Sequence, residues 1–312
     1  MNIELRHLRY FVSVAENLHF ARAAKQLGIS QPPLSQQIQA LERELGVRLF
    51  ERTNRRVELT EAGRLFLNEA RLALQQVERA ATIADRANRG EVGEVKVGYF
   101  GSMPFTLISQ KILYAFRTLH PDVHLDLQEM LSFQQIDPIM DGRLSLGFVR
   151  AIPKLPQPLC ARELFRESFI VIMRKDHPLA LTAENDAIEM KSLASEPFVF
   201  YPRSIGAGLY DHVISLCRDA GFNPRIGQEA GGAPTVIGLV AAGLGVSILP
   251  ASMARVKMED VVFRPLATKS TTAVWLAYRR DQRAPCTLAF IDVAVREAGG
   301  NIAVIEGSGS QE

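Results

Sequence analysis

Residues 20–46 read FARAAKQLGISQPPLSQQIQALERELG, and this stretch predicts two short helices joined by a tight turn. Gly28 is expected to end the first helix, because a residue without a Cβ adopts the left-handed turn at low cost. Ser30 stands at the expected N-cap of the second helix, and prolines follow in its first turn, where a missing N–H does no harm. The apolar face of the first helix consists of Ala21, Ala24 and Leu27.

The second helix has an apolar stripe on one side and amides and hydroxyls on the other. The stripe consists of Leu34, Ile38, Leu41 and Leu45. The residues left to face outward are Gln31, Ser35, Gln36 and Gln39. Such side chains can form hydrogen bonds with base edges in the major groove. The pattern also fits an ordinary helical hairpin with a solvated face, so the flanking sequence has to decide.

Positive charge is concentrated around this hairpin. The first 60 residues contain nine Lys/Arg and six Asp/Glu, whereas the other 252 contain 27 and 28. Residues 47–59, VRLFERTNRRVEL, predict a basic β-hairpin whose arginines are Arg52, Arg55 and Arg56. A basic hairpin beside a polar helix is typical of a wing that contacts phosphates or the minor groove, although three arginines in a turn can be mere surface. The combination favours DNA binding.

A long helix is predicted from Thr60 and Glu61 to Gly90. Its apolar positions alternate by three and four, which is a heptad seam: Leu67, Ala70, Leu74, Val77, Ala81 and Ala84. The helix could lie on its own domain, but a dimerising helix is favoured because it links a small DNA-binding unit to a larger body.

The stretch from about Leu5 to Gly63 resembles a known family. HLRYFVSVAENLHFARAAKQLGISQPPLSQQIQALERELGVRLFERTNRRVELTEAG is similar to the N-terminal domain of LysR-type transcriptional regulators. The resemblance implies an N-terminal winged helix-turn-helix at 3–60, a long dimerising linker helix at 61–91, and a two-lobed, periplasmic-binding-protein-like α/β effector domain at 92–299. Carried onto this sequence, the base-reading residues would be Gln31, Pro32, Pro33, Ser35 and Gln36, with Arg52, Arg55 and Arg56 in the wing.

From residue 94 onward, predicted strands alternate with predicted helices, which indicates an α/β body with a parallel sheet and right-handed crossovers. Two lobes fit the order, with crossing segments near 164–168 and 265–272. Lobe I would comprise 92–164 plus 270–299, and lobe II 165–269. Residues 300–312 are predicted to be a flexible tail.

Ligands of open α/β sheets bind beyond the carboxyl ends of strands, beside helix N-termini. The loops at these places carry hydroxyls and guanidinium groups, which indicates a small organic anion, with an aromatic acid among the candidates. Ser102, Ser132 and Thr235 are also ordinary N-cap residues, and the arginines could form surface ion pairs. The candidate loop residues are Ser102, Ser132, Arg150, Pro202, Arg203 and Ala233.

Within the family, YFGSMPF, GFVR and GLVAAGLGVSILPAS resemble regulators of aromatic-compound degradation, the benzoate, muconate and chlorocatechol group. That resemblance implies that inducer carboxylates meet Ser102, Ser132 and Pro202, with Ala233 and Leu209 nearby. It also implies a second inducer pocket that includes Arg150.

The expected protein is therefore a ligand-responsive transcription regulator and not an enzyme. The sequence contains no HExxH, GxSxG or HxE pattern. Its three scattered cysteines fit a reduced cytoplasmic protein without a disulfide framework or metal site. The alternatives are an α/β enzyme or a solute-binding protein with a fused N-terminal domain, but the latter lacks a signal peptide here. The expected partners are inverted-repeat operator DNA, a small-molecule inducer in place of any cofactor, and further copies in a dimer or tetramer. RNA polymerase is a further candidate, and no membrane is expected.

Overall fold

The computed structural model describes residues 2–52, 56–150, 155–181, 186–300 and 303–306. The chain divides into two compact units, Met1–Arg86 and Ala87–Glu312. Within the described residues, no helix has both the length and the apolar character needed to cross a membrane.

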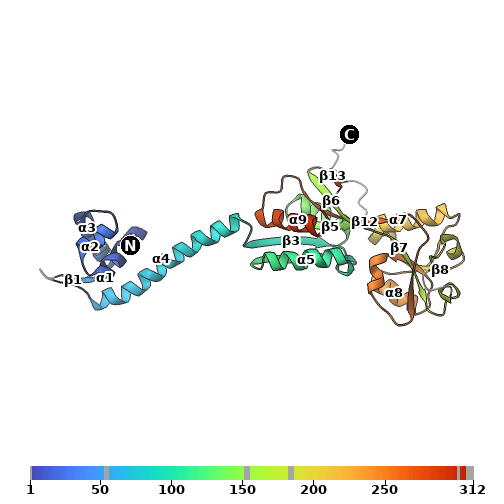
Figure 1. Ribbon diagram of the computed structural model, residues 1–312, viewed down its shortest axis with the longest axis horizontal. Helices are drawn as coiled ribbons and strands as arrows, with labels where there is room; N and C mark the ends of the chain where they lie inside the picture. The colour runs from blue at the N-terminus through green and yellow to red at the C-terminus, as the bar shows by residue number, and fades with distance from the viewer. Residues whose placement is uncertain (1, 53–55, 151–154, 182–185, 301–302, 307–312) are drawn as a thin grey trace. The chain divides into compact units, whose positions relative to one another are not determined.

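The first unit is a three-helix domain with a two-stranded wing (Figure 1). Its elements are α1 (Leu5–Asn17), α2 (Phe20–Gln26), α3 (Gln31–Leu45), β1 (Phe50–Arg52), β2 (Val57–Leu59) and the start of α4 (Glu61–Asn88). Phe11 lies at the centre of the core, with its ring centroid 5.3 Å from that of Phe50 and 5.0 Å from that of Phe66. The predicted face of α2 was wrong at Ala21, which is exposed, because Phe20 and Ala23 turn inward instead.

The packing at the start of α4 explains why residue 63 is a glycine. The Thr60 hydroxyl accepts a hydrogen bond from the Gly63 N–H at 2.9 Å and so caps the helix. A Cβ on Gly63 would lie 2.1 Å from the carbonyl oxygen of Leu49, so the close approach of α4 to the chain before β1 requires glycine.

The seam predicted along α4 divides into two parts. Ala70 is buried and Leu67 partly buried in the core of their own domain, so the first seam positions are already used. Beyond them, Leu74 and Val77 are half-buried, and Ala81 and Ala84 are exposed. A second apolar face is formed by the exposed side chains of Leu65, Leu72 and Ile83, which recur at helical spacing.

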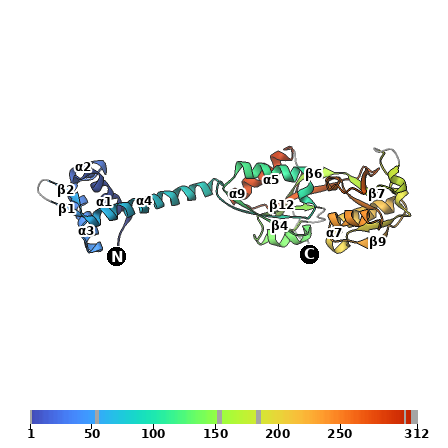
Figure 2. The same ribbon diagram turned by 90° about the horizontal axis from the view of Figure 1, so that it is seen from below.

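Lobe I of the second unit is built on a six-stranded sheet in the order β13-β6-β12-β5-β3-β4. Its strands are β3 (Gly93–Tyr99), β4 (Val123–Glu129), β5 (Leu146–Arg150), β6 (Leu159–Glu167), β12 (Thr272–Arg279) and β13 (Val304–Glu306). Its helices are η1 (Met103–Phe105), α5 (Leu107–Leu119), η2 (Ser132–Gln135), α6 (Ile136–Met140) and α9 (Pro285–Glu297). Figure 2 shows α5 and α9 together on one face, where the rings of Phe116 and Phe290 meet.

Two sequence expectations for lobe I were wrong. The sheet is mixed: β3 is parallel to β4 and β5, whereas β12 is antiparallel to β5 and β6. The tail is not wholly flexible either, because Val304–Glu306 pairs antiparallel with β6. The remainder of the predicted tail, 301–302 and 307–312, lies outside the described residues.

Lobe II has an antiparallel sheet in the order β10-β7-β11 and a parallel pair, β8-β9. Its strands are β7 (Phe169–Arg174), β8 (Pro197–Phe200), β9 (Arg225–Glu229), β10 (Ser247–Pro250) and β11 (Val261–Pro265). Its helices are η3 (Pro178–Leu181), η4 (Met190–Leu193), α7 (Arg203–Asp219), α8 (Ala233–Ala241) and η5 (Ala251–Arg255). The chain crosses between the lobes after Glu167 and again after Pro265.

Candidate DNA-binding and effector sites

The helix-turn-helix forms as predicted. Gly28 has a φ of 68°, the left-handed conformation expected of the turn. Leu34, Ile38 and Leu41 are fully buried, which fixes the rotation of α3 and leaves its other face to solvent. Ser30 occupies the N-cap position of α3, but its hydroxyl makes no capping hydrogen bond.

The predicted base-reading residues lie on that outer face of α3. Gln31, Pro32, Pro33 and Gln36 are exposed. Ser35 is half-buried, and its hydroxyl accepts a hydrogen bond from Nη1 of Arg52 at 3.2 Å. The face therefore presents amides, proline rings and one hydroxyl that already has a partner in the protein.

The wing is an antiparallel pair in which Glu51 lies opposite Glu58. Nη1 of Arg56 lies 3.8 Å from Oε1 of Glu58, and both side chains are largely exposed. Such a pair contributes little to stability, so Arg56 can exchange its partner for a phosphate. Arg55 lies outside the described residues. Arg52, the third predicted wing residue, is held against α3.

On the effector side, Ser132 and Arg150 are brought together. The Ser132 hydroxyl accepts a hydrogen bond from the backbone N–H of Arg150 at 3.0 Å. The Arg150 guanidinium lies 5.0 Å from the centroid of the Phe100 ring and pairs with Glu167 at 2.6 Å. Both charged side chains are at least nine-tenths buried, so each needs the other to offset its desolvation.

Glu167 also connects the two lobes. Its second oxygen, Oε2, accepts a hydrogen bond from the backbone N–H of Ser252 at 2.6 Å, at the start of η5 in lobe II. The sequence analysis did not single out Glu167, although it lies in the predicted crossing segment, where a carboxylate requires a nearby donor. Among the residues that the structure describes, Nε of Arg150 and the hydroxyl of Ser252 are buried without a hydrogen-bond partner.

Tyr201 immediately precedes the predicted residues Pro202 and Arg203. It directly follows β8 in lobe II and is buried. Burial raises the pKa of its phenol, and the charge of Arg150 acts in the opposite direction with a smaller effect. Tyr201 therefore presents a neutral hydroxyl that can both donate and accept a hydrogen bond.

The remaining predicted effector residues are distributed over both lobes. Ser102 precedes η1, and its hydroxyl makes no capping hydrogen bond. Pro202 is the N-cap of α7. Arg203 is exposed, and its Nε lies 2.7 Å from Oδ1 of Asp211 in an ion pair. Leu209 and Ala233 pack in the core of lobe II.

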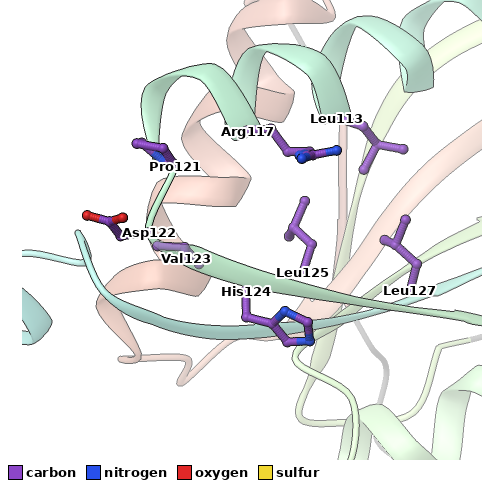
Figure 3. Close-up of a pocket in the computed structure, with 8 residues that line it drawn as sticks. All are labelled: Leu113, Arg117, Pro121, Asp122, Val123, His124, Leu125 and Leu127. Carbon is purple, nitrogen blue, oxygen red and sulfur yellow. The ribbon is translucent and has the colours of Figure 1, made fainter.

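A separate hollow of about 580 Å³ lies on the surface of lobe I (Figure 3). α5 contributes Leu113 and Arg117, and β4 contributes His124, Leu125 and Leu127. None of the predicted effector residues lines it. Nearby, Tyr114 and Leu119 of α5 are 75% and 55% exposed.

The fold and these surfaces agree with the comparisons with known proteins. Residues 5–64 match the bacterial regulatory helix-turn-helix protein model of the lysR family, and residues 88–299 match the LysR substrate binding domain. The chain belongs to the LysR family, and it is a ligand-responsive, DNA-binding transcription regulator.

Two curated relatives and one solved structure cover nearly the whole chain. The uncharacterized HTH-type transcriptional regulator YnfL of Escherichia coli is 47% identical over 93% of this chain and 97% of its own length. The HTH-type transcriptional regulator AlsR of Bacillus subtilis is 38% identical over 94% of this chain and 95% of its own. The crystal structure of full-length CbnR complexed with its target DNA is 32% identical, with a TM-score of 0.82 over 95% of this chain and 100% of that chain. The relatives are named as regulators, which agrees with the non-enzymatic interpretation.

Proposed function

We propose that the exposed face of α3 reads the operator and that the wing holds the phosphate backbone. The main support is that Leu34, Ile38 and Leu41 are fully buried, so α3 can present only its opposite face to DNA. On that face, Gln31, Pro32, Pro33, Ser35 and Gln36 would contact base edges. Arg55 and Arg56 would contact phosphates and set the register of the helix on the duplex.

The two roles separate in a binding experiment. Gln31→Ala is expected to weaken specific binding by ~1–3 kcal/mol and to leave binding to a scrambled duplex unchanged. Arg56→Ala is expected to weaken binding to both duplexes and to reduce the slope of log K against log salt by about 0.9. Equal effects of the two substitutions on both duplexes would contradict this division.

We propose that the effector is a small organic acid, with aromatic acids as the first candidates, and that it binds between the lobes. The lobes are joined by only two crossing segments, so a ligand that contacts both could change their separation. Because the buried guanidinium of Arg150 already has a carboxylate partner, the effector would depend on neutral donors and on Arg203, whose exposed pair with Asp211 can open. Those donors would be the hydroxyls of Ser102, Ser132 and Tyr201 and the backbone N–H groups that begin α8. The resemblance to regulators of aromatic-compound degradation supports the choice of acids.

A thermal-shift screen of aromatic acids, muconates and other small carboxylates would identify the effector, because binding raises stability by RT ln(1 + [L]/Kd). Ser102→Ala is expected to reduce the shift produced by the best acid and to leave DNA affinity unchanged. Ser192→Ala serves as the matched control, because Ser192 is exposed on η4 and bonds only to the carbonyl of Glu189. An undiminished shift in Ser102→Ala would remove Ser102 from the site.

We propose that the protein forms a tetramer, because it has two separate apolar surfaces for self-association. One is α4, through the Leu74–Val77 side or through the face of Leu65, Leu72 and Ile83. The other is the surface of α5 and β4, where Tyr114, Leu119 and Leu127 are exposed. Effector binding would alter how the subunits pack and thereby the bend between recognition helices, with RNA polymerase as a further partner.

Light scattering of the purified protein tests the assembly. Tyr114→Glu is expected to halve the mass of the tetramer, since a charge cannot be buried cheaply in an apolar contact. Leu72→Glu and Val77→Glu identify which side of α4 is used, because only the substitution in the contact should reduce the mass. An unchanged mass in all three variants would contradict the proposal.

A further inference from the structure

The guanidinium of Arg52 contacts other residues of its own domain, whereas an arginine that binds a phosphate would point into solvent. Its guanidinium lies 4.6 Å from the centroid of the Phe20 ring. Nη1 donates to the hydroxyl of Ser35 at 3.2 Å, and Nη2 pairs with Oε2 of Glu42 at 3.3 Å. The side chain of Arg52 is 29% exposed, whereas that of Arg56 on the same wing is 78% exposed.

Glu42 fixes this arrangement from the other side. Its Oε1 accepts hydrogen bonds from the backbone N–H groups of Leu49 and Phe50, at 2.8 and 3.1 Å. The carboxylate is therefore tied to the chain that leads from α3 into β1, and Oε2 remains for Arg52. Since Phe20 is buried in the domain core, the planar guanidinium is held by an aromatic face, a carboxylate and a hydroxyl.

The contact with Ser35 has a chemical consequence for recognition. A guanidinium can only donate hydrogen bonds, so the Ser35 oxygen is the acceptor in this pair. The Ser35 hydroxyl keeps its own proton, which it can donate to an acceptor such as N7 or O6 of guanine. The orientation of that hydroxyl depends on a residue that lies 17 positions away in the wing.

We propose that Arg52 is a positioning residue: it holds the Ser35 hydroxyl as a hydrogen-bond donor toward DNA and locks the wing to the recognition helix, and it does not bind a phosphate. The proposal rests on the DNA-reading role proposed for α3. It assigns Arg52 and Arg56, two arginines of the same wing, to different tasks. Arg52 acts through Ser35, and Arg56 acts through its charge.

The test uses the full-length protein and a duplex that the wild-type protein selects from a random pool, with a scrambled duplex for comparison. Fluorescence anisotropy gives the affinity of each variant over a series of NaCl concentrations. Ser35→Ala and Arg52→Lys are each expected to lower affinity for the selected duplex about tenfold, since lysine keeps the charge but lacks the planar fork. The double variant is expected to bind no more weakly than either single variant, because both changes remove one interaction.

Arg52→Gln removes the charge and separates positioning from phosphate binding. Its salt slope is expected to equal that of the wild type, whereas Arg56→Ala, the matched wing arginine, reduces the slope by about 0.9. Melting followed by circular dichroism checks that the variants fold. Arg52→Lys keeps the charge and an aliphatic stem. The comparison of Arg52→Lys with the double variant therefore decides the question even if Arg52→Gln unfolds.

The proposal would be overturned by wild-type affinity in Arg52→Lys, by additive losses in the double variant, or by a salt slope reduced by about 0.9 in Arg52→Gln. A different result is expected if α3 does not read the operator at all. In that case Gln31→Ala and Ser35→Ala would both keep the preference for the selected duplex over the scrambled one. If Ser35→Ala alone had no effect while Arg52→Lys weakened binding, the route through Ser35 would be wrong.

Discussion

Replacing Gly147 by alanine should destabilise lobe I, because the place of the new methyl group is already occupied. A Cβ at Gly147 would lie 2.2 Å from Oε1 of Gln135 and 3.1 Å from Cδ1 of Ile139. Gln135 is fully buried, and its Nε2 donates to the carbonyl oxygens of Met130 and Phe148 at 3.2 and 3.0 Å. The amide cannot move aside without losing these hydrogen bonds.

The expected cost follows from those contacts. Two lost hydrogen bonds account for roughly 1–3 kcal/mol. Overpacking of a filled core adds about 1–3 kcal/mol. We therefore expect Gly147→Ala to reduce the free energy of unfolding of lobe I by about 2–6 kcal/mol.

The single tryptophan of the chain, Trp275, reports on this lobe. It lies on β12 opposite Val149 and packs against the cluster that contains Ile139, so its fluorescence during urea unfolding follows the affected region. Gly101→Ala is the matched control in the same lobe. A Cβ there would meet only the end of the exposed Glu129 side chain, and we expect a change within about 0.5 kcal/mol.

A double variant identifies the cause of the loss. If Gln135 is the obstacle, Gly147→Ala should cost much less in a Gln135→Ala background than in the wild type. A Gly147→Ala protein that unfolds at the urea concentration of the wild type would refute the reasoning. An equal cost in both backgrounds would show that the clash with Gln135 is not responsible.

Three further predictions concern other parts of the chain. Gly63→Ala should destabilise the DNA-binding unit and weaken binding to all duplexes, because a Cβ would lie 2.1 Å from the Leu49 carbonyl oxygen; differential scanning calorimetry would detect it. Ile38→Ala should cost ~2–5 kcal/mol, as its fully buried side chain leaves a cavity under α3, and unchanged urea unfolding followed by circular dichroism would contradict it. Burial lowers the pKa of His212, so the unfolded chain binds more protons and stability should fall as pH drops through about 6.5. His212→Gln should reduce that loss, which melting temperatures at pH 7.5 and 5.5 would show.

The periodicity of the sequence predicted the elements whose burial depends on local spacing. Leu34, Ile38 and Leu41 face the core because residues three or four apart share one side of a helix. The same rule could not assign the seam of α4. Leu67 and Ala70 fit a heptad, but an apolar stripe fits a core in the same domain as well as a partner helix, and only the fold shows which is used.

Strand direction and long-range pairing were beyond the sequence pattern. Alternation of strands and helices indicated a parallel sheet, but β12 returns from lobe II through the second crossing and pairs antiparallel with both β5 and β6. The tail strand forms only because β6 offers it a free edge. For the site, Ser132 and Arg150 were predicted from loop positions, whereas the contacts of Glu167 join residues 17 and 85 positions apart. No spacing rule reports contacts of that kind.

The pairing of β13 with β6 also restricts how the lobe I sheet can grow. Among the described strands, β4 is the edge that faces away from β13, and it pairs with β3 alone. An edge strand attracts another strand, and a very short edge strand is one way in which proteins limit such addition. β13 spans three residues, whereas β4 at the other edge spans seven. Two copies joined edge to edge through β4 would form a twofold pair whose outer edges are the short β13 strands. The short C-terminal strand thus favours a finite assembly over a fibre.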